Sequence, residues 1–351
     1  MLSSSPNSSS YSETVIPFTT KDGFQCNLIH VEGSTPASKA PVLLSHGAGV
    51  RANIFRAPVE QTIVDALLHN GHDVWLENWR ASIDLPPSKW TLDDAAVYDH
   101  PAAVRVIAER TGASEINAIV HCQGSTSFVM SACAGLLPAV KTIVTNAVSL
   151  HMMVPGFSKF KLDCAVPIMK YIYPFLNPQW GINAPDFRTK LLKGVVELTH
   201  RECRNGVCKF SSFTYGTGFP VLWRHENLND ATHEWLKNEF ADVPMTFFEQ
   251  MAQCVRRGNL VSLGHFRELP DDLVAQPPQT DARFAFITGE MNVCFLPQSQ
   301  RRSFEFLDQF HPNYHSFHSF PGYGHLDVFM GKNAAKDTFP VIIDALDKSI
   351  H

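Results

Sequence analysis

Strand-length apolar runs alternate with helical patterns over the first part of the chain. The runs of strand length are Pro41–Ser45, Asp73–Glu77, Ile116–Val120 and Thr142–Val148. The segments with helical spacing between them are Phe55–His69, Leu92–Arg110 (with a break near Pro101) and Gly124–Leu136. Strand–helix alternation of this kind builds a parallel sheet that is covered on both faces. An antiparallel hairpin, Val15–Thr19 with Phe24–Val31, is expected before it.

The alternation stops at about residue 150 and resumes after residue 278. The resumed elements are Phe284–Thr288, Ser299–Phe310, His315–Phe320 and Ala334–Lys348. We therefore predict an α/β core from residues 13–149 and 279–351, with 150–278 as an inserted helical lid. The insertion is rich in aromatic residues and includes the helical segments Leu191–Cys203 and Ala231–Phe240. Residues 1–12, rich in serine, are expected to be a disordered lead-in.

Charge and composition exclude several function classes. The net charge is −5, from 29 Lys and Arg against 34 Asp and Glu, and no basic stripe argues for nucleic acid. No apolar run reaches the ~18 residues of a membrane span, and residues 1–12 lack the features of a signal peptide. The 8 cysteines are scattered, which indicates free thiols in a reducing compartment, so we expect a cytoplasmic location.

A candidate nucleophile lies where a predicted strand meets a predicted helix. Ile116–Val120 is followed by His121-Cys122-Gln123-Gly124-Ser125, which places Cys122 at the apex of a tight turn. This is the arrangement of the G-x-S-x-G nucleophile elbow, with a thiol in place of the hydroxyl and Val120 at the first small position. The alternative is that Cys122 is a small buried core residue, as many free cysteines are.

Two further turns supply the groups that a thiol nucleophile needs. His325 lies in a glycine-rich loop between the last strand and the last helix, in the position of the base in the chain order nucleophile, orienting residue, histidine. The turn Ser45–Gly49 follows the first parallel strand, and its glycines allow the N–H of Ala48 to join that of Gln123 in an oxyanion hole. An ordinary strand-ending turn is the alternative interpretation of Ser45–Gly49.

The residue that orients the histidine is predicted to be Asn292. It occupies the place, after the strand Phe284–Thr288, where an acid is usual in this arrangement. A thiol is acidic enough to give its proton to histidine before attack, so a neutral amide suffices to orient the base, as in Cys-His-Asn proteases. Glu290 and Asp327 remain alternatives for this role.

These motifs resemble the α/β-hydrolase superfamily over nearly the whole chain from Val15 onward. More narrowly, Asp73–Arg80, His121–Ser125 and Gly322–Asp327 resemble hydrolases related to the domain fused to cholesterol-oxidase-like flavoproteins. The resemblance implies the α/β-hydrolase fold and acyl transfer. Cysteine-type members of the superfamily include fungal enzymes that release polyketide chains from thioesters or close them into lactones, and the dienelactone hydrolases.

The expected function is therefore thioesterase-like: release of an acyl chain, such as a polyketide, through a Cys122 thioester, by hydrolysis or lactone cyclisation. The substrate would be an acyl thioester or ester, which an acyl carrier protein can present. A carboxylesterase or lactone hydrolase of the dienelactone type is one alternative, and a non-catalytic binding module is another. No cofactor is expected. His200, Cys203 and Cys208 have a spacing that only loosely suits a metal, because a second close pair of ligands is absent, so we expect a structural role and no metal site.

Overall fold

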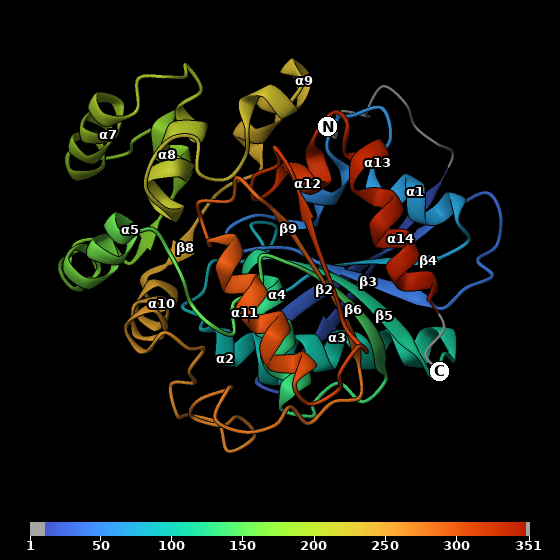
Figure 1. Cartoon of the computed structure of the whole chain (residues 1–351). Coiled ribbons are helices and arrows are strands. Elements are labelled where there is room, and N and C mark those ends of the chain that lie inside the picture. The colour runs from blue at the N-terminus through green and yellow to red at the C-terminus, as the bar shows by residue number, and fades with distance from the viewer. Residues whose placement is uncertain (1–10, 349–351) are drawn as a thin grey trace.

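The computed structural model describes residues 11–348, which contain an eight-stranded sheet in the order β1-β2-β4-β3-β5-β6-β9-β10 (Figure 1). The strands are β1 (Ser12–Thr19), β2 (Gln25–Glu32), β3 (Pro41–Ser45), β4 (Asp73–Asn78), β5 (Ile116–His121), β6 (Val140–Asn146), β9 (Arg283–Gly289) and β10 (Ser316–Phe320). β1 pairs antiparallel with β2, and β2 with β4, while the other neighbours are parallel. The mostly parallel sheet is therefore confirmed. The predicted lead-in lies outside the described residues, except for Tyr11 and Ser12.

Helices pack on both faces of this sheet (Figure 1). Those outside the segment between β6 and β9 are α1 (Ile63–His69), α2 (Leu92–Asp94), α3 (His100–Thr111), α4 (Cys122–Cys133), α11 (Pro297–Asp308), α12 (Asp327–Met330), α13 (Ala334–Asp337) and α14 (Phe339–Asp347). α1 contacts α14, and α3 contacts α4, so the helices form two layers with the sheet between them. The central strands are buried on both faces, which is why they appear in the sequence as unbroken apolar runs.

Proline divides two helices that the sequence predicted as single units. The expected helix Phe55–His69 is a 3-10 turn, η1 (Ala52–Arg56), followed by α1, because Pro58 has no N–H to continue the ladder. The expected helix Ala334–Lys348 is interrupted at Thr338, and Pro340 lies in the first turn of α14. The break near Pro101 becomes a π turn, η2 (Ala95–Asp99), that leads directly into α3.

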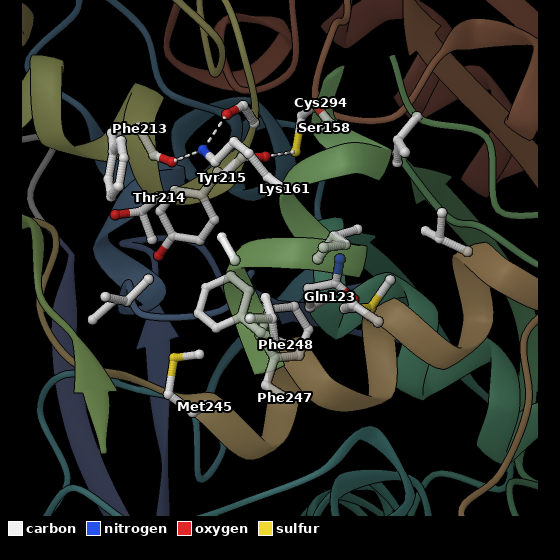
Figure 2. A pocket seen from close by; sticks show the side chains of 18 of the residues that line it. Gln123, Ser158, Lys161, Phe213, Thr214, Tyr215, Met245, Phe247, Phe248 and Cys294 are labelled. Carbon is white, nitrogen blue, oxygen red and sulfur yellow. Dashed lines mark hydrogen bonds between the residues drawn. The ribbon is translucent and has the colours of Figure 1, made fainter. Parts of the chain in front are cut away.

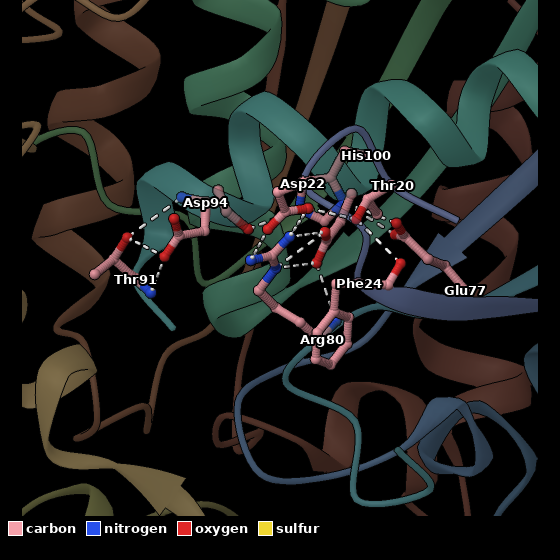
Figure 3. A network of polar contacts seen from close by, with 10 residues as sticks. Thr20, Asp22, Phe24, Glu77, Arg80, Thr91, Asp94 and His100 are labelled. Atoms are coloured by element: carbon pink, nitrogen blue, oxygen red, sulfur yellow. Dashed lines mark hydrogen bonds and ion pairs between the residues drawn. The ribbon is translucent and has the colours of Figure 1, made fainter. Parts of the chain in front are cut away.

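A buried polar network joins the end of β4 to this π turn (Figure 3). Arg80 Nη2 donates to Asp99 Oδ1 at 2.7 Å, and Arg80 Nη1 donates to Asp22 Oδ2 at 3.0 Å. Burial alone would favour a protonated Asp99 and raises its pKa, but the guanidinium of Arg80 acts against this shift. The charges are therefore paired rather than isolated, as the cost of burying a lone charge requires.

The same region holds a serine–histidine–glutamate chain that is entirely buried. His100 Nδ1 lies 3.0 Å from Glu77 Oε1, and His100 Nε2 lies 2.8 Å from Ser127 Oγ. Ser127 is within α4, and its hydroxyl donates to the carbonyl of Gln123 at 2.9 Å. All three side chains are fully buried, so this chain anchors the start of α4 to β4 rather than meeting a substrate.

The segment between β6 and β9, residues 147–282, is called the insertion below. It contains α5 (Gly156–Phe160), η3 (Lys161–Ala165), α6 (Val166–Met169), β7 (Phe175–Leu176), η4 (Pro178–Gly181), α7 (Phe187–Thr199), α8 (Gly206–Tyr215), η5 (His225–Asn227), α9 (Asp230–Trp235), η6 (Leu236–Asn238), β8 (Val243–Pro244) and α10 (Met245–Arg257). Helices α5, α7, α8 and α10 gather at one side of the sheet (Figure 1, left). α7 begins earlier than the sequence predicted because Asp186 caps it, accepting from the N–H of Thr189 at 2.9 Å. None of the helices among residues 11–348 has the length and apolar character that crossing a membrane requires.

Candidate active site

The predicted site residues follow the carboxyl ends of parallel strands. Cys122 follows β5, and His325 lies in the loop after β10. Parallel strands end at the same edge of the sheet, which is where open α/β sheets form their sites. The structure brings the two together: Cys122 Sγ and ring nitrogens of His325 and His121 all lie within 4.8 Å of one another.

Cys122 occupies a strained position at the junction of β5 and α4. Its φ is 56°, in the left-handed region that few residues other than glycine adopt, and α4 begins at Cys122 itself. The turn closes only because its neighbours are small. A Cβ on Gly124 would collide with the carbonyl oxygen of His46, and a Cβ on Gly47 would lie 2.9 Å from Cys122 Cβ. Backbone strain of this kind is more common at functional sites than in an ordinary core.

Two backbone N–H groups face the sulfur. They belong to Gln123 and Ala48, the pair that the sequence predicted for an oxyanion hole, and both stabilise the thiolate. The turn that carries Ala48 is fixed from two sides: Trp79 Nε1 donates to the carbonyl of His46 at 2.9 Å, and Tyr215 Oη donates to that of Ala48 at 2.8 Å. Preorganised donors of this sort need no reorganisation when a negative oxygen forms beside them.

His325 is fully buried and is held through its backbone rather than its ring. Asn146, the last residue of β6, donates from Nδ2 to the carbonyl of His325 at 2.9 Å and to Nδ1 of His121 at 2.8 Å. The two imidazole rings lie with their centroids 4.7 Å apart. Among the described residues, neither ring nitrogen of His325 has a hydrogen-bond partner.

Asn292 makes no hydrogen bond to the His325 ring in this structure. Its Oδ1 accepts from the N–H groups of Cys294 and Phe295 at 3.0 and 3.3 Å, and its buried Nδ2 has no partner among the described residues. The two turns are nonetheless adjacent, because the N–H of Met291 donates to the carbonyl of Tyr323 at 2.8 Å.

The two alternative residues for orienting the histidine are engaged elsewhere. Glu290 is exposed and accepts from Ser319 Oγ at 2.9 Å. Asp327 is buried and accepts from the N–H of Gly324 at 2.9 Å and from Asn227 Nδ2 at 2.5 Å, which holds the loop that carries His325.

Burial disfavours a resting thiolate–imidazolium pair. It raises the pKa of the Cys122 thiol to about 12, although the N–H groups of Gln123 and Ala48 act in the opposite direction. It lowers the pKa of His325 to about 3. Both shifts favour the neutral forms, in contrast to the early proton transfer expected from the sequence.

An apolar cavity extends from Cys122 into the insertion. Figure 2 shows Gln123, Phe247 and Phe248 in its lining. Its empty volume is about 800 Å³, including its opening to solvent. The apolar part of the lining comes mainly from α6, α10 and the turn after Asn292: Val166, Met169, Met245, Phe247, Phe248, Met251, Val255 and Phe295. A cavity with this lining suits an apolar group beside the thiol.

Two polar residues of this cavity carry no motif in the sequence, and the prediction missed both. Tyr215 ends α8 and fixes the Ala48 turn. Lys161 Nζ donates to the carbonyls of Phe213 and, at 2.7 Å, Gly216, at the end of α8, and burial lowers its pKa to about 8. A lysine on the last carbonyls of a helix stabilises that helix end, so Lys161 joins η3 to α8.

A second group of chemically active side chains lies in the insertion. Cys203 and Cys208 meet His225 and His233, and their ligand atoms all lie within 4.8 Å of one another. His200, which the sequence placed with the two cysteines, is not a member of the group; its Nδ1 contacts Thr199 Oγ1 at 2.9 Å.

Comparison with curated proteins finds relatives over part of the chain. No family model matches it. Human lipase member K is 32% identical over 127 residues, covering 31% of this chain and 31% of the lipase. The poly(3-hydroxyalkanoate) polymerase subunit PhaC of Haloferax mediterranei is 30% identical over 106 residues, covering 30% of this chain and 21% of the polymerase. The matches thus span less than a third of the length of either relative.

Solved structures match nearly the whole chain. The monoacylglycerol lipase of Paleococcus ferrophilus covers 95% of this chain and 98% of its own, with a TM-score of 0.56 and 13% identity. DcsB, solved with its substrate analogue, covers 97% and 100%, with a TM-score of 0.58 and 15% identity. The chain has the α/β-hydrolase fold.

The elbow gives a first prediction, for Gly124→Ala. The added methyl group meets the His46 carbonyl, so α4 must move away from β3, and we expect a loss of roughly 1–3 kcal/mol in the free energy of unfolding. Urea unfolding measures it. Gly194→Ala, in α7 with open space around its Cβ, is the control and should be neutral or slightly stabilising. Equal unfolding midpoints for the two variants would contradict the close approach.

The neutral resting site gives a second prediction, for the reaction of Cys122 with iodoacetamide. Because its pKa is raised to about 12 and that of His325 is lowered to about 3, the rate should rise about tenfold per pH unit from about pH 6 to about pH 9, without a plateau. Peptide mass spectrometry follows the alkylation, with exposed Cys164 as the internal reference. A plateau below about pH 8 would instead indicate a thiolate–imidazolium pair.

Proposed function

We propose that the protein is an acyl-transfer hydrolase in which Cys122 forms a thioester intermediate with the substrate and His325 is its base. The observation that carries this proposal is the left-handed Cys122, with its sulfur beside an imidazole and two backbone N–H groups. If Cys122 were only a core residue, nothing would explain its strained backbone. If the protein were only a binding module, nothing would explain why two N–H groups converge on the sulfur.

Acylation begins with a thioester carbonyl beside Cys122. The thiol proton moves to a ring nitrogen of His325 as the sulfur attacks the carbonyl carbon, and the carbonyl oxygen becomes an oxyanion that accepts from the N–H groups of Gln123 and Ala48. Collapse of this intermediate breaks the bond to the leaving thiolate, which takes the proton from His325. The acyl chain is then attached to Cys122 and the ring is neutral again.

Deacylation uses the same groups in reverse. Water, or a hydroxyl of the bound chain, gives its proton to His325 and attacks the acyl carbon, and the returned proton restores the Cys122 thiol. Water gives a free acid, whereas an internal hydroxyl gives a lactone. A bound chain that fills the apolar cavity would displace water from it, which would favour the lactone for a chain that carries a suitably placed hydroxyl.

The substrate class follows from the thiol and from the cavity. Exchange of an acyl group between two thiols is nearly balanced in energy, so a Cys122 thioester forms readily from a carrier protein or coenzyme A thioester. The apolar lining of the cavity suits the apolar part of an acyl chain such as a polyketide. The likeness to a poly(3-hydroxyalkanoate) polymerase, whose name describes the joining of hydroxyacyl units, supports acyl transfer over binding alone.

An oxyester is the second candidate substrate. The likeness to lipase member K and to a monoacylglycerol lipase favours it, and the same Cys122, His325 and oxyanion donors would serve. Comparing kcat/KM for an acyl thioester with that for the matched oxyester separates the two candidates, because the acyl group in the cavity is the same in both.

Intact-mass measurement with a hydroxyacyl coenzyme A thioester tests the function. We expect an acyl adduct on the wild type, no adduct on Cys122→Ala, and at least ~10³-fold slower acylation in His325→Ala. Cys294→Ala is the matched control, a buried cysteine in the same cavity that the mechanism does not use, and it should keep the adduct. An adduct that survives Cys122→Ala, or no adduct and no turnover with thioesters and oxyesters alike, would overturn the proposal.

We also propose that Asn292 orients His325 when substrate is bound. Its Nδ2 and the ring nitrogens of His325 are buried groups on adjacent turns, and none of them has a hydrogen-bond partner within residues 11–348. Asn292→Asp would place a carboxylate there, raise the pKa of His325 and stabilise the imidazolium.

The pH dependence of Cys122 alkylation measures this effect. Asn292→Asp should introduce a plateau at neutral pH, while Asn292→Ala should keep the wild-type slope and lower acyl transfer. If Asn292→Asp follows the wild-type profile, with an unchanged unfolding midpoint, Asn292 does not act on His325.

A further inference from the structure

Four side chains from separate parts of the insertion converge away from Cys122. Cys203 lies in the loop between α7 and α8, and Cys208 in the first turn of α8. His225 begins η5, and His233 lies in α9. Cys208 is buried and the other three are half-buried, so the group is enclosed but reachable from solvent. The mechanism proposed above uses none of them.

Two sulfur–nitrogen distances in the group match those of a tetrahedral metal site. Cys203 Sγ lies 3.5 Å from His233 Nε2, and Cys208 Sγ lies 3.3 Å from His225 Nε2. Bonds of about 2.3 Å to sulfur and about 2.0 Å to nitrogen, at tetrahedral angles, place sulfur and nitrogen about 3.5 Å apart. Two separate S–H···N hydrogen bonds would account for the two distances. They would not account for all four ligand atoms lying within 4.8 Å of one another.

The surroundings orient the ligands as in a built metal site. The N–H of Asn205 donates to Cys203 Sγ at 3.2 Å, a contact that stabilises a thiolate. The Asn205 side chain caps α8, accepting from the N–H of Cys208 at 3.2 Å, and donates from Nδ2 to the carbonyl of His233 at 2.8 Å. One residue thus holds three of the four ligands in place, which is the role that outer contacts play around bound metals.

We propose that Cys203, Cys208, His225 and His233 bind one zinc ion as a structural site. Two thiolates with two imidazoles form a donor set that selects zinc, and four protein ligands leave no open position for catalysis. The histidines supply the second pair of ligands whose absence argued against a metal from sequence alone. They follow Cys208 by 17 and 25 residues, and the fold brings them to the cysteines.

The ion would fix the end of α8 that lies away from the thiol. The same helix ends in Phe213 and Tyr215, which line the acyl cavity, and Tyr215 holds the Ala48 turn. Zinc therefore stabilises the insertion and the cavity wall without touching Cys122 or His325. Because the four ligands are not assembled in the unfolded chain, the free energy of zinc binding adds to the free energy of unfolding.

Metal analysis of the purified full-length protein tests the site directly. Expressed in zinc-supplemented medium and then gel-filtered, the wild type should hold about one zinc ion per chain by plasma mass spectrometry. Cys208→Ser and His233→Asn should lose it. Cys164→Ser, an exposed cysteine of the insertion, and His200→Asn, the neighbour that the sequence grouped with the cysteines, are matched controls and should retain it.

Cobalt provides a second readout that needs no variant to fold. The wild type stripped with a chelator and loaded with Co²⁺ should show the strong visible bands of a tetrahedral ion and a thiolate charge-transfer band, and zinc should abolish both. Wild-type protein without zinc and without these bands overturns the proposal. So does a Cys203–Cys208 disulfide, detected as two cysteines that react with iodoacetamide only after reduction, or loss of zinc in His200→Asn to the same extent as in His233→Asn.

Discussion

The close approach of α4 to the end of β3 is the constraint on which the site depends. With Gly124 against the His46 carbonyl and Gly47 against the Cys122 side chain, the chain turns from strand to helix without a loop. The turn leaves Cys122 in a left-handed conformation, with its sulfur at the strand edge. The contact of His100 with Ser127 Oγ, and of His100 with Glu77 in β4, anchors α4 beside this turn.

Burial then determines what chemistry the sulfur can perform. The His325 imidazole has no carboxylate partner in the described part of the chain, and burial lowers its pKa while it raises the pKa of the Cys122 thiol, so burial favours the neutral form of both groups. A serine in such surroundings would be harder to activate, because its hydroxyl is far less acidic than a thiol. The N–H groups of Gln123 and Ala48 offset part of the burial at the sulfur and are positioned for a developing oxyanion. Cysteine at position 122 and an amide at position 292 are thus compatible choices.

The sequence predicted the structure well wherever interactions between neighbours along the chain determine it. Apolar runs located the central strands to within one or two residues, and glycines beside a cysteine located the elbow, because both signals depend on neighbours in the chain. The proline-divided helices were merged, since periodicity continues across Pro58 although the N–H ladder does not. The partners of Asn292 were also missed, because Oδ1 is taken by the N–H groups of its own turn, which only the fold reveals. His225 and His233 carry no motif at all.

The insertion shows both what neighbouring residues reveal in the sequence and what only the folded chain reveals. Its aromatic composition indicated the core of a lid. It did not indicate that α8 extends from the Cys203–Cys208–His225–His233 group to the turn that carries Ala48. Lys161 and Tyr215 hold the carboxyl end of α8, through the carbonyls of its last turn and through Ala48. The amino end is held by Asn205 and, if zinc is bound, by four ligands as well. A wall fixed at both ends keeps its shape when an apolar chain enters. In the proposed mechanism, the choice between water and an internal hydroxyl therefore depends on how the chain folds within that wall, and residues remote from Cys122 would influence the product without taking part in the chemistry.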